Sequence, residues 1–308
     1  MGAIFMTAFF MVSGYSMYLT YQEENLSHIS NIKIFYIKRA LNLFPLYYVV
    51  SVIYIVLCGT ESLKENLILF PVELLGIQSV FTTLFPISHN DGTWFISCIL
   101  FCYLIYPFLQ EIVKQSNDNT KIKCCLVAIM IMLWSPIVVL KFDLSNIYSN
   151  PFFRMVEFFV GIILCSVREK LIYKKMYSKL TIFIEWVILI SMVTFGIKLK
   201  FQVGNYMLYE WISLPLFGMI LISMSKADFE KANNKVIQYL CKISYAFFLA
   251  QFFAFKITNK ILMVLCKNSN LLKIIISFIV CLMLAVIFHE TVEKNISIYL
   301  RRKILKSI

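Results

Sequence analysis

The sequence predicts an all-α protein, a polytopic bundle of about nine transmembrane helices, on three observations. Of its 308 residues, 60% are apolar and only 15% are charged, whereas soluble domains average about 45–50% apolar and about 25% charged. Uncharged stretches long enough to cross a bilayer recur along the chain. Lysine and arginine are concentrated in every second connection between those stretches. An ordinary soluble enzyme, a disordered chain and a secreted disulfide-rich domain are therefore excluded.

The predicted spans come from gaps between charged residues and from further apolar stretches. A helix needs about 20 mostly apolar residues to cross the hydrocarbon layer, within a range of about 17–25. The spans are residues 1–22, 40–60, 92–110, 124–140, 152–167, 180–197, 206–225, 243–265 and 274–289.

The segment 66–86 is nearly apolar enough to be a tenth span. Pro71, Glu73, Gly76 and Pro86 lie within it. If it crossed the membrane, every later connection would change sides and the charge bias would be lost. We therefore expect an interrupted, interfacial or re-entrant element on the outer face.

The positions of the basic residues predict the orientation. Alternate connections hold 20 Lys and Arg in total, and the opposite set holds 6. Because basic residues collect in cytoplasmic loops, we expect a multi-pass plasma-membrane protein with a cytoplasmic C-terminus and an external start. The net charge of +12 then follows from topology, and we expect no nucleic-acid partner. The basic connections are 21–42, 113–123, 168–179, 226–242 and 290–308.

Polar residues inside predicted spans are candidates for a site, because ionisable groups are costly there. Arg154 and Glu157 share one face near the outer end of a span. They form either an ion pair that only fixes helix packing or a polar lining for a sugar or anionic substrate. Ser244, Gln251 and Thr258 are spaced by seven, so we expect one stripe turned toward the bundle.

Cysteine and histidine give no metal-binding pattern. The nine cysteines include no CxxC pair, and the three histidines are dispersed at His28, His89 and His289. We expect the cysteines to be buried as small apolar residues and expect no metal.

Six segments, in order, resemble the membrane acyltransferases of the acyltransferase-3 family. Together they extend over nearly the whole chain. They are FFMVSGYSMYL at 9–19, FYIKRALNLFPLYY at 35–48, WFISCILFCYLIYPFL at 94–109, NPFFRMVEFFVGIIL at 150–164, ISYAFFLAQFF at 243–253 and VEKNISIYL at 292–300.

The resemblance implies transfer of an acyl group, with acetyl as the default, from cytoplasmic acyl-CoA to a hydroxyl of an extracytoplasmic glycan. The acceptor is a surface polysaccharide or its lipid-linked precursor. We expect three groups of site residues: Lys38 and Arg39 at the acyl-CoA phosphates, Arg154, Glu157 and Trp94 on the acceptor side, and Ser244, Tyr245 and Gln251 along an acyl path.

The sequence also departs from the family pattern. The chain opens at what resembles the second helix, so residues 1–308 form a single domain without the first helix, which carries the histidine proposed as general base. The true start therefore lies upstream, or the chain lacks that residue. Asn42, Gln251 and Asn295 replace an Arg, a His and a Pro of the later motifs, and Gln251 cannot act as a base.

Two other functions are consistent with the same residues. One is an inert or truncated relative that acts as a binding or assembly partner, which an in-frame helix upstream of Met1 would argue against. The other is a transporter of polysaccharide or lipid intermediates, which predicts a symmetric pair of interrupted helices.

The topology predicts which connections are accessible from outside the cell. A cysteine introduced by Ser178→Cys, in a background without native cysteines, should react with an impermeant maleimide only after permeabilisation. Lys64→Cys should react in intact cells. Labelling of position 178 from outside intact cells would overturn the orientation.

Overall fold

A computed structural model of the protein describes residues 2–58, 62–81, 89–142, 145–171, 179–198, 218, 234–264 and 270–305. Those residues contain helices, turns and connecting segments and no strand, so the all-α prediction is confirmed for them. The chain divides into two compact units. The first comprises Met1–Ile32 and Cys98–Asp228, and the second comprises Lys33–Ser97 and Phe229–Ile308.

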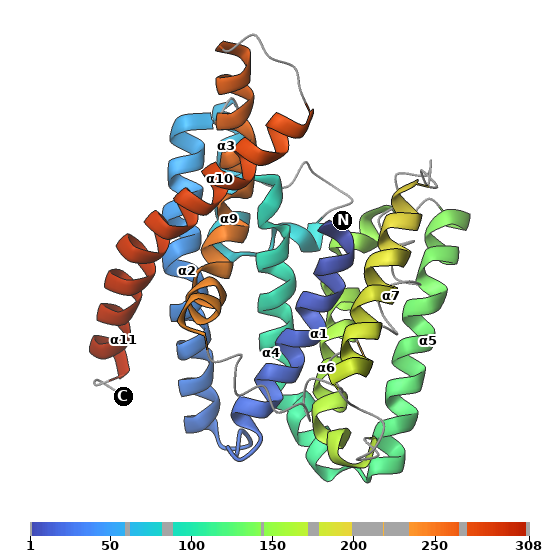
Figure 1. The fold of residues 1–308 in the computed structure, drawn as a ribbon. Coiled ribbons are helices and arrows are strands. Elements are labelled where there is room, and N and C mark those ends of the chain that lie inside the picture. Colours follow the sequence, from blue (N-terminus) through green and yellow to red (C-terminus); the bar gives the residue numbers. More distant parts are fainter. Residues whose placement is uncertain are drawn as a thin grey trace. The chain divides into compact units, whose positions relative to one another are not determined.

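Long helices dominate both units (Figure 1). The first unit holds α1 (Gly2–Tyr21), most of α4 (Trp94–Gln115), α5 (Asp118–Phe142), the 3₁₀ turn Ser145–Ser149, α6 (Pro151–Leu171) and α7 (Lys179–Lys198). The second holds most of α2 (Ile29–Cys58), α3 (Leu63–Leu75), the 3₁₀ turns Gln78–Phe81 and Asp91–Thr93, α9 (Lys235–Val264), α10 (Asn270–Phe288), the π-helical segment His289–Ser297 and α11 (Ile298–Leu305).

Five helical stretches in the described part of the chain are long and apolar enough to cross a membrane. A polytopic helical membrane protein is therefore confirmed. Helices α1, α6 and α7 coincide with three more predicted spans, while the predicted span 206–225 lies outside the described residues except for residue 218. The five stretches are Ile29–Leu57, Trp94–Gln115, Asp118–Val139, Lys235–Met263 and Leu271–Ile304.

The segment 66–86, expected to be an interfacial or re-entrant element, contains most of α3, a helix of 13 residues, and the 3₁₀ turn Gln78–Phe81. The expectation that Pro71 interrupts it is wrong, because Pro71 lies inside the helix. A proline removes only one backbone donor, and α3 is secured at both ends. A capping box between Ser62 and Glu65 starts the helix, and Gly76 ends it with a φ of 67°.

Side chains of neighbouring segments hold the C-terminal end of α3 in the second unit. The hydroxyl of Tyr47 in α2 donates to the carbonyl oxygen of Glu73 at 2.8 Å, and that of Tyr48 donates to Leu74 at 2.6 Å. The Gln78 amide then donates to the carbonyl of Thr93 at 2.7 Å. These bonds fix α3 between α2 and the turn that precedes α4.

In the first unit, α1 packs directly on α6 (Figure 1). A methyl group built on Gly14 would overlap the backbone carbonyl of Phe158, and one built on Gly161 would overlap that of Met11. The two backbones therefore approach too closely for any side chain at these glycines. Close helix contact through small residues is a usual source of stability between membrane helices.

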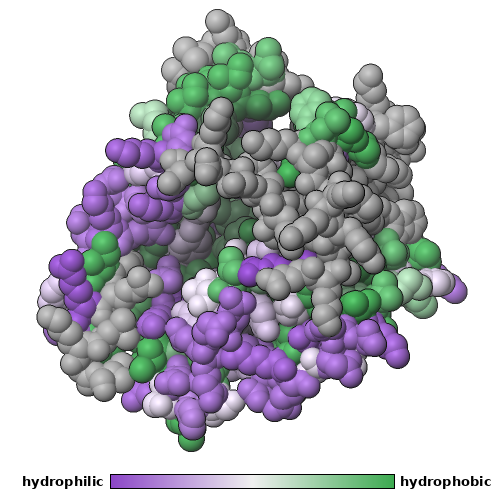
Figure 2. Space-filling model, turned by 60° about the horizontal axis from the view of Figure 1, so that its bottom comes forward, coloured by the Kyte–Doolittle hydropathy of each residue, from purple (hydrophilic) through white to green (hydrophobic). Residues whose placement is uncertain are grey.

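Polar side chains of α4 close the C-terminal end of α1. The amide of Gln110 donates to the carbonyl of Tyr21, and Lys114 donates to that of Glu24 at 2.7 Å. These bonds satisfy carbonyls that a helix end leaves without intrahelical partners. Hydrophilic side chains gather at this end of the unit, where α4 ends and α5 begins (Figure 2).

The close contact predicts that Gly161→Ala lowers the stability of the protein, by about 1–3 kcal/mol or more, because the added methyl group meets backbone that cannot rotate away. Gly218→Ala is a matched control, since its new methyl group would meet Leu164 at an ordinary 3.9 Å. Thermal unfolding of both variants in detergent, followed by fluorescence, checks the difference. Equal stability of the two variants would contradict the packing described above.

Candidate functional site

The first polar cluster lies at the start of α6. Asn150 caps the helix by accepting the N–H of Phe152 at 2.9 Å, and Pro151 occupies the first helical position. The cap sets the register that places Arg154 and Glu157 on one face. Their side chains form an ion pair between Nη1 and Oε1, and both are fully buried.

Two other segments of the first unit, α1 and the 3₁₀ turn Ser145–Ser149, enclose this pair. The hydroxyl of Thr7 in α1 donates to Oε1 of Glu157 at 3.2 Å. The Nε of Arg154 donates to the carbonyl of Tyr148 at 2.8 Å, and its guanidinium lies 4.7 Å from that ring's centroid and 5.7 Å from that of Phe10. The predicted pair therefore exists and fixes α1 against α6, which fits the packing alternative. The acceptor-side role stays a prediction.

A second cluster, in the second unit, joins α3 to the turn before α4. The carboxylate of Glu73 accepts two hydrogen bonds from His89: the backbone N–H reaches Oε1 at 2.8 Å, and Nδ1 lies 2.8 Å from Oε2. The other ring nitrogen, Nε2, lies 2.6 Å from Oδ1 of Asn66. Glu73 and His89 are only 6% and 7% exposed.

The sequence alone does not reveal this cluster. In the sequence, Glu73 is one of several residues that interrupt an apolar segment, and His89 is an isolated histidine in a connection. One signal was available: a carboxylate within an apolar helix has to find a partner, because burying an unpaired charge is costly. Sequence spacing could not identify that partner, which lies 16 residues further along the chain.

The N-terminal cap of α3 orients Asn66. The Nδ2 of Asn66 donates to the carbonyl of Ser62 at 3.0 Å, which leaves its oxygen directed at His89. Ser62 also binds the Glu65 carboxylate, and its backbone N–H, followed by its hydroxyl, holds the pKa of Glu65 below its ordinary value. Glu65 thus contributes to the cap at neutral pH and loses that contribution as the pH falls through its lowered pKa.

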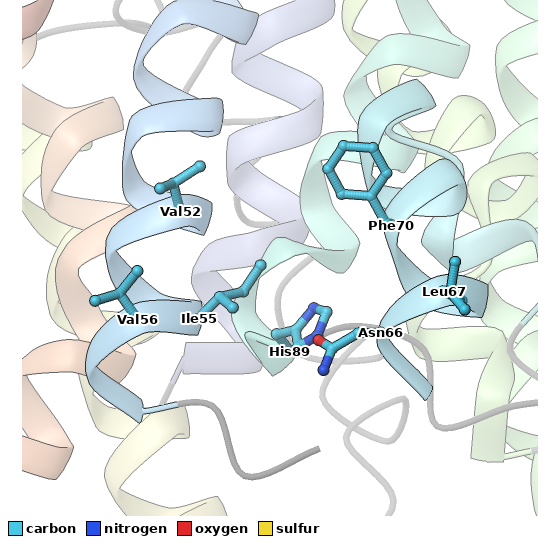
Figure 3. Close-up of a pocket in the computed structure, with 7 residues that line it drawn as sticks. All are labelled: Val52, Ile55, Val56, Asn66, Leu67, Phe70 and His89. Atoms are coloured by element: carbon cyan, nitrogen blue, oxygen red, sulfur yellow. The ribbon is translucent and has the colours of Figure 1, made fainter. Parts of the chain in front are cut away.

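His89 and Asn66 lie at one end of an open pocket of about 410 Å³ (Figure 3). The walls come from α2 and α3 and are apolar, so the two polar side chains are the exception in the lining. A mostly apolar pocket with a few converging polar groups is the usual form of a small-molecule site. The apolar walls are Val52, Ile55, Val56, Leu67 and Phe70.

The expected acyl-path residues lie on α9 and do not share one surface. Ser244 is exposed and donates to the carbonyl of Cys241 in its own helix, so the expectation that it faces inward is wrong. Its hydroxyl is satisfied by that helix and needs no neighbour. Tyr245 donates to the carbonyl of Leu43 in α2 at 2.8 Å. Gln251 lines a separate pocket of about 360 Å³ between α9 and α10.

The remaining candidates also lie in the second unit. Lys38 and Arg39 are half-buried and lie well inside α2, because that helix begins at Ile29. They are therefore within a helix that begins earlier than the predicted span 40–60. The guanidinium of Arg39 lies 5.5 Å from the ring of Phe35. Trp94 is the first residue of α4 and is half-buried.

Comparison with protein families identifies the chain. A family model described as an acyltransferase domain, that of the acyltransferase-3 family, matches residues 1–290. The chain belongs to the acyltransferase-3 family. Searches among curated proteins and among solved structures gave no match.

The structure brings together motifs of this acyltransferase-3 protein that are distant in sequence. The glycines of segments 9–19 and 150–164 meet at the contact between α1 and α6. In the second unit, the hydroxyl of Tyr245, in segment 243–253, donates to the carbonyl of Leu43, in segment 35–48. The ring centroids of Phe248 and of Phe95, at the start of α4, are 4.5 Å apart. The motif residues therefore form contacts within each unit.

The buried pair predicts a large penalty for removing one partner. Arg154→Ala leaves Glu157 buried without its cation and should cost about 3–5 kcal/mol, whereas Arg154→Met combined with Glu157→Leu should restore most of that loss. Lys121→Ala in the more accessible Asp118–Lys121 pair of α5, at 3.3 Å, is the control and should cost less than about 1 kcal/mol. Thermal unfolding in detergent measures all three, and similar losses for Arg154→Ala and Lys121→Ala would contradict the analysis.

Proposed function

We propose that this acyltransferase-3 membrane protein transfers an acetyl group from acyl-CoA to a hydroxyl of a surface polysaccharide or of its lipid-linked precursor. The observation that carries the proposal is the family match over residues 1–290, on a chain whose described part contains five candidate spans. A membrane enzyme can take its donor from one compartment and deliver the acyl group in the other. We also propose that residues 1–308 act as one acyltransferase domain.

The donor site is proposed at Lys38 and Arg39. Acyl-CoA carries several phosphates, and adjacent cationic side chains bind phosphate through charge-assisted hydrogen bonds. In the predicted orientation the basic connection 21–42, which includes both residues, lies on the cytoplasmic side, where acyl-CoA is made. The half-burial of both side chains supports a site that is reached from solvent and partly shielded from it.

A role on the acceptor side is proposed for Arg154 and Glu157 in the first unit and, separately, for Trp94 in the second, and an acyl path is proposed along Tyr245 and Gln251. Charged side chains can hydrogen-bond to sugar hydroxyls, and an aromatic ring can pack against the face of a sugar. The chemistry also requires a base for the acceptor hydroxyl and donors that stabilise the developing oxyanion. A buried guanidinium provides such donors.

A deletion strain tests the function directly. Mass spectrometry of its surface glycans should show loss of acetyl groups, and the wild-type gene should restore them. The Arg154→Met/Glu157→Leu variant, expressed at the wild-type level, should fail to restore them if the pair has a role beyond packing. Unchanged glycans in the deletion strain would contradict the proposed function.

The donor site predicts an effect on the Michaelis constant. Replacing Lys38 and Arg39 together by Gln should raise the KM for acetyl-CoA about tenfold or more, since two phosphate contacts are lost. Lys33→Gln, an exposed residue of the same helix, should change KM less than about twofold. Acetyl transfer from radiolabelled acetyl-CoA in membrane vesicles measures both, and an unchanged KM in the double variant would exclude this donor site.

A further inference from the structure

We propose that the groove between α9 and α10 binds an anionic diacyl phospholipid, with the lipid phosphate at Lys273 and an ester carbonyl at Ser277 and Gln251. The groove has a volume of about 360 Å³, and all the residues that line it belong to the second unit. The inference goes beyond the proposed function, and its test requires no acyl transfer.

The two helices that form the groove pack directly on each other and follow each other closely in the chain, so they run antiparallel. The ring centroids of Phe247 in α9 and Phe278 in α10 are 5.9 Å apart. The thiol of Cys281 donates to the carbonyl of Phe247 at 3.2 Å. One turn closer to the connection between the helices, this register places Gln251 of α9 level with Ser277 of α10.

Two polar side chains of the groove need a partner from outside the protein. The hydroxyl of Ser277 and the amide of Gln251 both line it. Neither side chain has a hydrogen-bond partner among the described residues, although Ser277 is only 6% exposed. Water is scarce in the hydrocarbon region, so a polar group there has to be paired by protein or ligand. Both groups can donate to a carbonyl oxygen of a ligand.

A positive charge lies at the outer end of the groove. Among the described lining residues, Lys273 is the charged one, and it belongs to the first turn of α10. In the predicted orientation the connection before α10 lies on the outer side of the membrane. Ser277 follows one helical turn deeper, about 6 Å along the axis. In a diacyl phospholipid the ester carbonyls likewise lie just below the phosphate, toward the acyl chains.

The walls of the groove suit the acyl chains of such a lipid. Phe255, Ile274 and Phe278 are 46%, 67% and 59% exposed, and they belong to two of the candidate spans. Apolar side chains exposed on a membrane span are in contact with lipid chains. A polyprenyl phosphate carries no carbonyl below its phosphate and would leave Ser277 and Gln251 unpaired, and inorganic phosphate would leave the walls uncovered. The combination of groups therefore favours a diacyl phospholipid.

Gln251 also belongs to the proposed acyl path. Its amide has two donor hydrogens and one acceptor oxygen, so a bond to a lipid carbonyl leaves further polar sites on the same side chain. The test below changes Lys273 and Ser277, which have no role in the proposed acyl transfer. Failure of either proposal therefore leaves the other unaffected.

Native mass spectrometry of the full chain in detergent measures the binding of phosphatidylglycerol across a lipid titration. Lys273→Gln should weaken it about fivefold, because one lysine near a membrane surface is worth about 1 kcal/mol. Ser277→Ala should weaken it about threefold, and the double variant at least about tenfold. Lys260→Gln is the control and should change binding less than about twofold, since Lys260 is an exposed residue of α9 that does not line the groove.

Competition on the wild-type protein tests which phosphate compound the groove prefers and does not depend on any variant. Neither a polyprenyl phosphate nor inorganic phosphate, at the concentration of the phosphatidylglycerol, should displace it. Displacement by the polyprenyl phosphate would assign the groove to a lipid-linked glycan carrier, and displacement by inorganic phosphate would reduce it to a phosphate site. Either result would overturn the proposal, as would absent binding to wild type or equal losses in Lys273→Gln and Lys260→Gln.

Discussion

The first unit depends on one contact, the direct approach of the α1 and α6 backbones at Gly14 and Gly161. That approach brings Thr7 within hydrogen-bonding distance of Glu157 and Phe10 over the guanidinium of Arg154. A buried ion pair is stable only when its geometry is good and its remaining polar atoms are satisfied. The glycines therefore do more than pack two helices, because they determine how well a pair of charges is enclosed.

The second unit also buries a carboxylate, that of Glu73, but binds it in a different way. Glu73 lies in a helix too short to be a candidate span, and its carboxylate lies against His89, from the turn before α4, and not against a residue of its own helix. Tyr47 and the capping box at Ser62 fix the two ends of that helix. The carboxylate and the imidazole are thus held by separate segments, which lets one of them face a pocket.

The sequence predicted those features that follow from local pattern. The length of uncharged stretches located the helices, and a spacing of three residues predicted the Arg154–Glu157 pair, because helix geometry alone brings such residues together. Features that depend on non-local contacts were missed. Ser244 has helical spacing with Gln251 yet binds its own helix, and His89 could not be matched with Glu73 because the two are 16 positions apart and no helical spacing relates them. Pro71 gave a false signal, since the caps at both ends of α3 outweigh one missing donor.

The contact between α1 and α6 also has a consequence for biosynthesis. Thr7 and Glu157 are 150 positions apart, so α1 cannot form its contact with α6 until about 150 further residues have been synthesised. Meanwhile its glycine-lined surface has to be covered by lipid or by an insertion factor. Arg154 and Glu157, by contrast, belong to one helix and neutralise each other before that helix meets any other. The later helix can therefore enter the bilayer with no net charge from this pair. The contact between α1 and α6 is then delayed by the time needed to synthesise the intervening residues, and not by the cost of burying an unpaired charge.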